Sequence, residues 1–135
     1  MANEATITTL LGNQGDPVEY QVAAGTAIPK GSLMEFETGG DPKTVIISTA
    51  DGKFFAGIAA NEKTATDGVT VMACITHCVA ECKYSAAGTL GQPQKLSGVN
   101  TIADADSDTV ATAGEVVGIG LETATTGTGA VLINL

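Results

Sequence analysis

The amino-acid sequence predicts an all-β fold, a small barrel or sandwich of short strands. Apolar residues come in short runs separated by turn residues, and no segment of a dozen residues carries an apolar stripe of helical period. The chain is rich in Gly, with 17 residues, whereas aromatic residues make up only 4% of it. A core without large rings must be built from Val, Ile, Leu and Ala, which is typical of a compact β domain.

Seven of the apolar runs are expected to form strands, because each is short and bounded by turn chemistry. In chain order they are residues Val18–Ala23, Leu33–Glu37, Thr44–Ser48, Phe54–Ala59, Val69–Cys78, Glu115–Leu121 and Ala130–Leu135. The Asp51-Gly52 and Asp67-Gly68 pairs predict hairpin turns, since both central positions of a type I′ turn need φ > 0. One short helical turn is expected near Ala103–Asp108.

Short phrases recur in the chain and predict two similar halves. Ala23–Thr26 returns as Ala86–Thr89, and Gly57-Ile58 returns as Gly118-Ile119, at offsets of about 61 to 63 residues. Such matches also arise by chance in a chain rich in Gly, Ala and Thr. We expect one barrel domain over residues 18–135, built from halves at about 20–75 and 84–135, because a half of about sixty residues does not easily bury its apolar face alone.

Residues 1–17 are expected to form an extended N-terminal arm and linker. The stretch Gly12–Pro17 is rich in turn residues and separates the arm from the domain. A segment of this kind cannot offset the entropy of ordering by itself. We therefore expect the arm to be mobile in the free protein and to become ordered on binding, as a strand added to a neighbouring subunit or a partner protein.

Length and charge exclude several classes of function. A chain of 135 residues is one domain by the usual scaling, so a multidomain enzyme is not expected. Its 15 acidic against 6 basic residues give a net charge of −9, which opposes binding to nucleic acid or to an anionic membrane. No run of 18 apolar residues predicts a membrane span. Three cysteines in one segment do not make a disulfide framework, and we expect folding in a reducing cytoplasm.

The segment from Cys74 to Cys82 is the one cluster of metal-type ligands in the sequence. On a strand, Cys74, Cys78 and Cys82 stand about 13 Å from one another in turn, too far for one zinc ion or a disulfide. We expect no metal and three cysteines that act as small buried apolar residues. His77 is the one histidine, and on a strand it points away from Cys78, so a catalytic pair is not expected and no enzyme is predicted.

The alternating Asp104, Asp106 and Asp108 look like the opening of a calcium-binding loop. Thr109 stands where such a loop needs its glycine, although Glu115 occupies the terminal position. A solvated loop is the preferred interpretation, and a weak cation site is the alternative.

Several phrases together resemble the capsid cement, or head decoration, proteins of tailed viruses. They are Val22–Met34, Phe55–Ala59, Ala86–Gly91, and Val117–Ala124 running into Gly129–Ile133. The resemblance implies a small barrel of the β-clip kind and a structural virion protein made in the host cytoplasm. It also implies a place on the outer capsid surface, where homotrimers bind and stabilise the shell of major capsid protein, without a cofactor.

Contacts with the shell or within the trimer are expected on the arm and on loops. The candidates are Ala5, Ile7, Thr9 and Leu11 in the arm, Asp41 and Lys43 in the turn Gly39–Lys43, and Asn100 and Asp104 in the stretch Gly98–Thr109. The alternative function is a ligand- or carbohydrate-binding β-clip module, because such domains share the Ala-Gly-x-x-Ile-x-x-Gly-x-Leu phrase of Ala24–Leu33. A module of that kind should gather aromatic or charged side chains in a groove.

Overall fold

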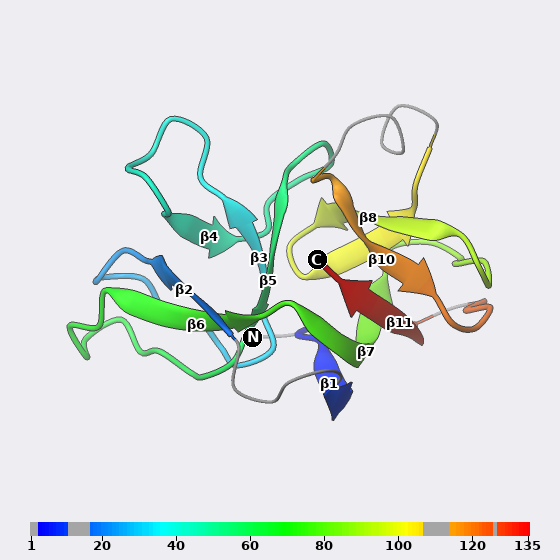
Figure 1. The fold of residues 1–135 in the computed structure, drawn as a ribbon, viewed down its shortest axis with the longest axis horizontal. Helices are drawn as coiled ribbons and strands as arrows, with labels where there is room; N and C mark the ends of the chain where they lie inside the picture. The colour runs from blue at the N-terminus through cyan, green and yellow to red at the C-terminus, as the bar shows by residue number, and fades with distance from the viewer. Residues whose placement is uncertain (1–2, 11–16, 107–113, 126) are drawn as a thin grey trace.

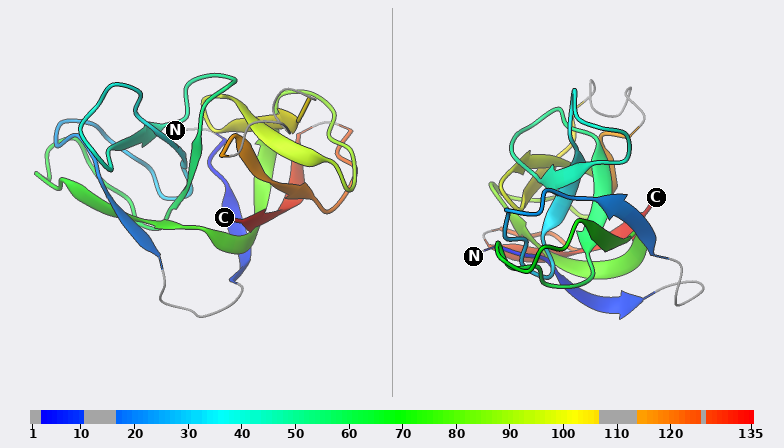
Figure 2. Two further views of the ribbon diagram at one scale, coloured as in Figure 1. Left: turned by 45° about the horizontal axis from the view of Figure 1, so that its top comes forward. Right: turned by 90° about the vertical axis from the view of Figure 1, so that its left-hand side faces the viewer.

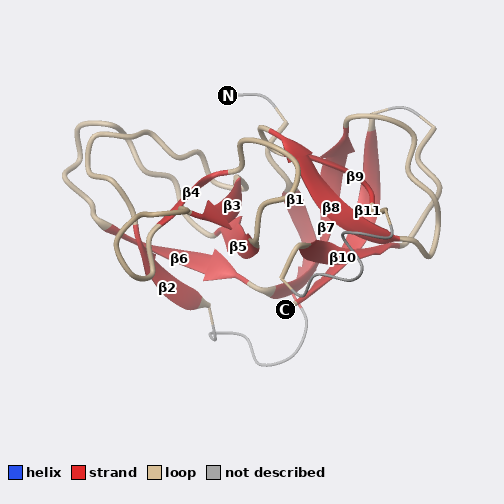
Figure 3. Ribbon diagram, turned by 90° about the horizontal axis from the view of Figure 1, so that it is seen from above, coloured by secondary structure: helices blue, strands red, loops and turns tan. Residues whose placement is uncertain are grey.

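The computed structural model describes residues 3–10, 17–106, 114–125 and 127–135. These residues form eleven strands and no helix, so no helix able to cross a membrane occurs among them (Figures 1 and 3). The strands are β1 (Thr6–Leu10), β2 (Val18–Gln21), β3 (Leu33–Phe36), β4 (Val45–Ile47), β5 (Phe55–Ala59), β6 (Val71–Ile75), β7 (His77–Tyr84), β8 (Pro93–Gly98), β9 (Thr101–Asp104), β10 (Val116–Gly120) and β11 (Thr128–Asn134). The all-β prediction is confirmed.

Two local predictions are corrected. The helical turn expected near Ala103–Asp108 is wrong at its start, because Ala103 and Asp104 belong to β9, which pairs antiparallel with β8. Residues 107 and 108 lie outside the described part of the chain. The strand expected over Val69–Cys78 is two strands, β6 and β7, which meet at Thr76. β1, β8, β9 and most of β7 lie outside the segments that were predicted to be strands.

The second half of the chain is a closed barrel of five strands. They follow the order β7-β11-β10-β8-β9, and the parallel pairing of β9 with β7 closes the ring. The first half is a five-stranded sheet in the order β2-β6-β5-β3-β4, whose end strands meet at one parallel bridge between Gln21 and Thr44. The two halves lie side by side along the long axis of the molecule, and β6 leads directly into β7 (Figures 1 and 2).

The strand pairings of the two halves match residue by residue. Met34 opposite Gly57 in the first half corresponds to Gln94 opposite Gly118 in the second, and both registers shift at the next pair. β4 on β3 corresponds to β9 on β8, and β6 on β5 corresponds to β11 on β10. The parallel pairing that closes each ring also recurs. The expectation of two similar halves is confirmed, and the counterpart of β2 is β7.

The halves are joined by a shared core. One apolar cluster fills the first half and includes Met34, Val45 and Cys74. The larger cluster fills the second barrel, and Leu33, Phe55 and Ile58 of the first half belong to it. Apolar burial therefore continues across the junction, which makes the two halves one packed body.

The N-terminal strand is part of this body. β1 pairs antiparallel with β7, from Thr6 opposite Glu81 to Leu10 opposite Cys78. Ala5 is buried in the larger core, and its N–H donates to the carbonyl of Gly31 at 2.7 Å. The expectation of an unpaired arm in the free protein is wrong for these residues, because β9 covers only one end of the β7 edge and β1 takes the rest.

Candidate interaction surface

The cysteine segment is divided between two cores. Cys74 lies in the core of the first half, whereas Cys78 and Cys82 point into the second barrel, and all three thiols are buried and free. Burial raises the pKa of Cys74 and of Cys82 to about 12 and that of Cys78 to about 11. His77, the neighbour of Cys78, is exposed. The prediction of buried cysteines is confirmed, and neutral buried thiols facing away from the histidine do not form a nucleophile and base pair.

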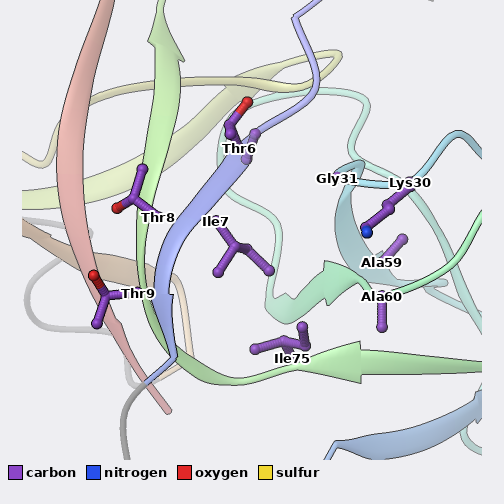
Figure 4. A pocket seen from close by; sticks show the side chains of 10 residues that line it. Thr6, Ile7, Thr8, Thr9, Lys30, Gly31, Ala59, Ala60 and Ile75 are labelled. Carbon is purple, nitrogen blue, oxygen red and sulfur yellow. The ribbon is translucent and has the colours of Figure 1, made fainter.

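A groove of about 490 Å³ runs beside β1. One side is formed by Ala5 and by β1 as far as Thr9, and the other by residues of the first half, Lys30, Gly31, Ala59, Ala60 and Ile75 (Figure 4). Ile7 points across this space toward the first half, where Ile75 closes the floor, and Thr8 and Thr9 lie on the opposite side of the strand. The lining holds one charged side chain, that of Lys30, and no aromatic ring. The groove therefore suits extended backbone with small apolar side chains better than a sugar.

The candidates in the arm have different environments. Ala5 is buried, so its side chain cannot reach a partner, and its selection as a contact residue was incorrect. Ile7 is half-buried at the groove, and Thr9 is exposed. Leu11 lies outside the described residues. β1 ends the six-stranded sheet with β7 on one side, and its other edge is an acceptor for a further strand.

Asn100 was expected on the surface but is fully buried at the junction of the halves. Its side-chain oxygen accepts a hydrogen bond from the Leu33 N–H at 2.8 Å, and its own N–H donates to Ser48 Oγ at 2.9 Å. Ser48 Oγ in turn donates to the carbonyl of Gly98 at 2.8 Å. Asn100 has φ of 54°, a conformation that asparagine tolerates better than most residues. It fixes one half on the other and cannot touch a partner.

The remaining candidates lie at the surface. Asp41 and Lys43 are exposed in the turn before β4, and Lys43 has φ of 61°. Asp104 is half-buried, and its carboxylate accepts hydrogen bonds from the Thr89 N–H at 3.0 Å and from Gln94 Nε2 at 2.9 Å. Burial acts to raise the pKa of Asp104, but the bonds from Gln94 and Thr89 hold it below its usual value. Both hydrogen bonds end on Oδ1 of Asp104, and this oxygen thus serves the fold.

A charged contact also joins the halves. Lys95 Nζ lies 2.8 Å from Asp51 in the first half and 3.1 Å from Asp106 in the second. The hydrogen bond that Lys95 donates to Asp51, followed by the one that it donates to Asp106, raises the pKa of Lys95. Asp106 is therefore paired with a lysine, and Asp108, the last member of the expected calcium-like run, lies outside the described residues.

An exposed apolar face on the second barrel was missed by the sequence analysis. Ile119 in β10 lies between Pro93 in β8 and Leu132 in β11, and the exposed Leu90 and Leu121 flank this row. We define the terminal face as Pro93, Val116, Ile119 and Leu132. The sequence signal for this face is the recurrence of Gly57-Ile58 as Gly118-Ile119. The recurrence pairs Ile58, which is buried between the halves, with Ile119, which is exposed.

The fold is similar to that of a known protein, although the sequence is not. No family model and no curated protein matches the chain. Among solved structures, the chain is similar to the head fiber gp8.5 N base of bacteriophage phi29, with a TM-score of 0.58 and 15% sequence identity. The match covers 86% of this chain and 92% of that chain. The two chains share a fold. At this level of identity the likeness carries no site residue across.

Proposed function

We propose that the chain is a structural virion protein that decorates and stabilises the outer surface of a tailed-virus capsid, where it binds the shell of major capsid protein as a homotrimer. The carrying observation is the fold that it shares, over 86% of its length, with the base of a phage head fiber. The phrases between Val22 and Ile133 that resemble cement proteins support the same class of function from a separate source.

The surface of the molecule fits this role. A protein that binds a shell needs a rigid body and a surface that recognises the shell, and it needs no reaction centre. The fused halves supply the body, and β1 supplies an edge whose Thr6, Thr8 and Thr9 are exposed and uncharged. An extended segment of the shell protein can add to this edge by backbone hydrogen bonds and place small side chains against Ile7 and Ile75 in the groove.

The test is the content of purified particles. Particles from the source of this chain are separated on a density gradient, and the chain is quantified against the major capsid protein. We expect a fixed stoichiometric ratio and labelling of intact heads by an antibody against the exposed turn Thr64–Val69, which lies outside the contact candidates. Absence of the chain from particles, or labelling only after the heads are opened, would contradict the proposal.

A further inference from the structure

The first half is held on the second by a defined apolar face. This joint face consists of Leu33, Phe55, Ile58 and Ile75, which are packed into or against the larger core. The matching registers give each residue a counterpart in the second half. In the same order, the counterparts are Pro93, Val116, Ile119 and Leu132, the terminal face.

The terminal face has kept its apolar character but has lost its cover. Ile58 is 0% exposed, whereas its counterpart Ile119 is 38% exposed. At the rim, Ala60 and Lys30 of the groove correspond to Leu121 and Leu90, so the second half is the more apolar there. A row of exposed aliphatic residues of this kind is typical of a surface that another protein covers.

The surface that receives the joint face also has a counterpart. In the second barrel the receiving end includes Ala80, Leu96 and Asn100, which are all buried. The corresponding residues of the first half are Val18, Phe36 and Lys43, which we define as the open mouth. Val18 is 41% and Phe36 is 37% exposed, and the ring of Phe36 packs edge-on against that of Tyr20, with the ring centroids 5.3 Å apart.

The local geometry of the two receiving ends agrees. Lys43 and Asn100 both have positive φ, at 61° and 54°, so the two turns have the same backbone shape. The residues beside the joint face and the terminal face also correspond. The Ser48 N–H donates to the carbonyl of Leu33 at 2.8 Å, and the Ala105 N–H donates to the carbonyl of Pro93 at 2.8 Å. Ala105 thus takes the place of Ser48 beside the terminal face.

We propose that the terminal face of one copy docks on the open mouth of a second copy, and that this contact repeats the junction between the halves. The occupant of the face is therefore a second copy of this chain, because the chain itself carries the complementary surface. The contact is head to tail, because each copy contributes its terminal face to one neighbour and its open mouth to another. Repetition of such a contact produces a closed ring when the rotation from copy to copy is a whole fraction of a turn. The inference rests on the self-association included in the proposed function and needs no capsid.

Site-directed cross-linking tests the predicted contact. Ser48 Oγ lies 2.9 Å from Asn100 N within the chain, and the corresponding pair between copies is Ala105 and Lys43. Under mild oxidation, the double variant A105C and K43C is expected to form intermolecular disulfides, and an equal mixture of the two single variants is expected to form dimers. Neither single variant alone should cross-link, because the contact is not two-fold symmetric. The native thiols are buried and do not compete.

Light scattering on the wild-type chain and on charge variants gives an independent readout. Ile119→Glu and Leu121→Glu are each expected to weaken association at least tenfold, whereas Val69→Glu, an exposed valine outside both surfaces, should leave it unchanged. Thermal unfolding verifies that each variant is folded. A monomeric wild-type chain, no cross-link in the double variant, or cross-linking of a single variant would overturn the inference. Loss of head binding with association intact would contradict only the proposed function.

Discussion

Lys63 shows how one buried charged residue can hold a loop. Its side chain is 1% exposed, and its ammonium donates to the carbonyls of Ala24 at 2.6 Å, Thr26 at 2.9 Å and Thr64 at 3.2 Å. The corresponding position in the second half is Ala124. Ala124 pairs with Gly88, and the ring of Tyr84 lies so close to Gly88 that a Cβ atom at this glycine would overlap the ring. The two halves thus fill one backbone frame with different chemistry.

Lys63→Met is expected to destabilise the protein by about 1–3 kcal/mol, because the hydrogen bonds that the buried ammonium donates to three carbonyls and its ion pair with Asp67 are lost. Chemical denaturation with a fit of the unfolding free energy measures the loss. Lys30→Met is the matched control, since Lys30 is exposed, and it should change the free energy by less than about 0.5 kcal/mol. Similar values for the two variants would refute the role of Lys63.

At the scale of elements, β1 connects the two halves. It is hydrogen-bonded to β7 of the second half, while Ala5 is bonded to Gly31 of the first. An edge strand of this kind also protects the strand beneath it, because an uncovered β7 edge would be a template for aggregation.

Ile7→Asn is expected to lower the unfolding free energy by about 1–2 kcal/mol, since Ile7 is half-buried against the larger core. Thr6→Asn, at an exposed position of the same strand, should remain within about 0.5 kcal/mol of the wild type. Denaturant titration of both variants makes the comparison. An Ile7→Asn protein as stable as the Thr6→Asn protein would mean that β1 does not contribute to the fold.

At the scale of the whole molecule, the buried thiols make stability depend on alkaline pH. Below pH 9 the thiols are protonated in both the folded and the unfolded chain and have no effect. When the pH exceeds 9.0, the ordinary pKa of a cysteine thiol, the unfolded chain releases thiol protons. The folded chain retains them, since the pKa of Cys82 is about 12 in the fold. The unfolded state then binds fewer protons, so the free energy of unfolding falls as pH rises.

We expect the unfolding free energy to fall between pH 9 and pH 11, by at most about 1.4 kcal/mol per pH unit for each thiol. Denaturant titrations at several pH values measure the slope. Cys82→Ala should reduce the slope by the share of one thiol, and an unchanged slope in that variant would contradict the burial of Cys82.

The sequence allowed the fold class and the similarity of the halves to be predicted, because apolar runs and turn residues are local signals. It did not allow the position of Asn100 to be predicted, since an Asn in a short turn between strands is typical of the surface and its burial depends on where the first half docks. For the same reason the exposure of Ile119 was missed. Its own segment is as apolar as that of Ile58, and only the packing of whole halves distinguishes them.

The placement of the two end strands determines how the molecule responds to mechanical force. β1 and β11 lie on opposite sides of β7, and both run antiparallel to it. β1 begins opposite Glu81, whereas β11 ends opposite His77, so tension between the chain ends slides both strands along β7 in opposite directions. The backbone hydrogen bonds lie across that direction and must break together instead of one after another. A cargo tethered at either end would therefore pull on a mechanically resistant part of the fold.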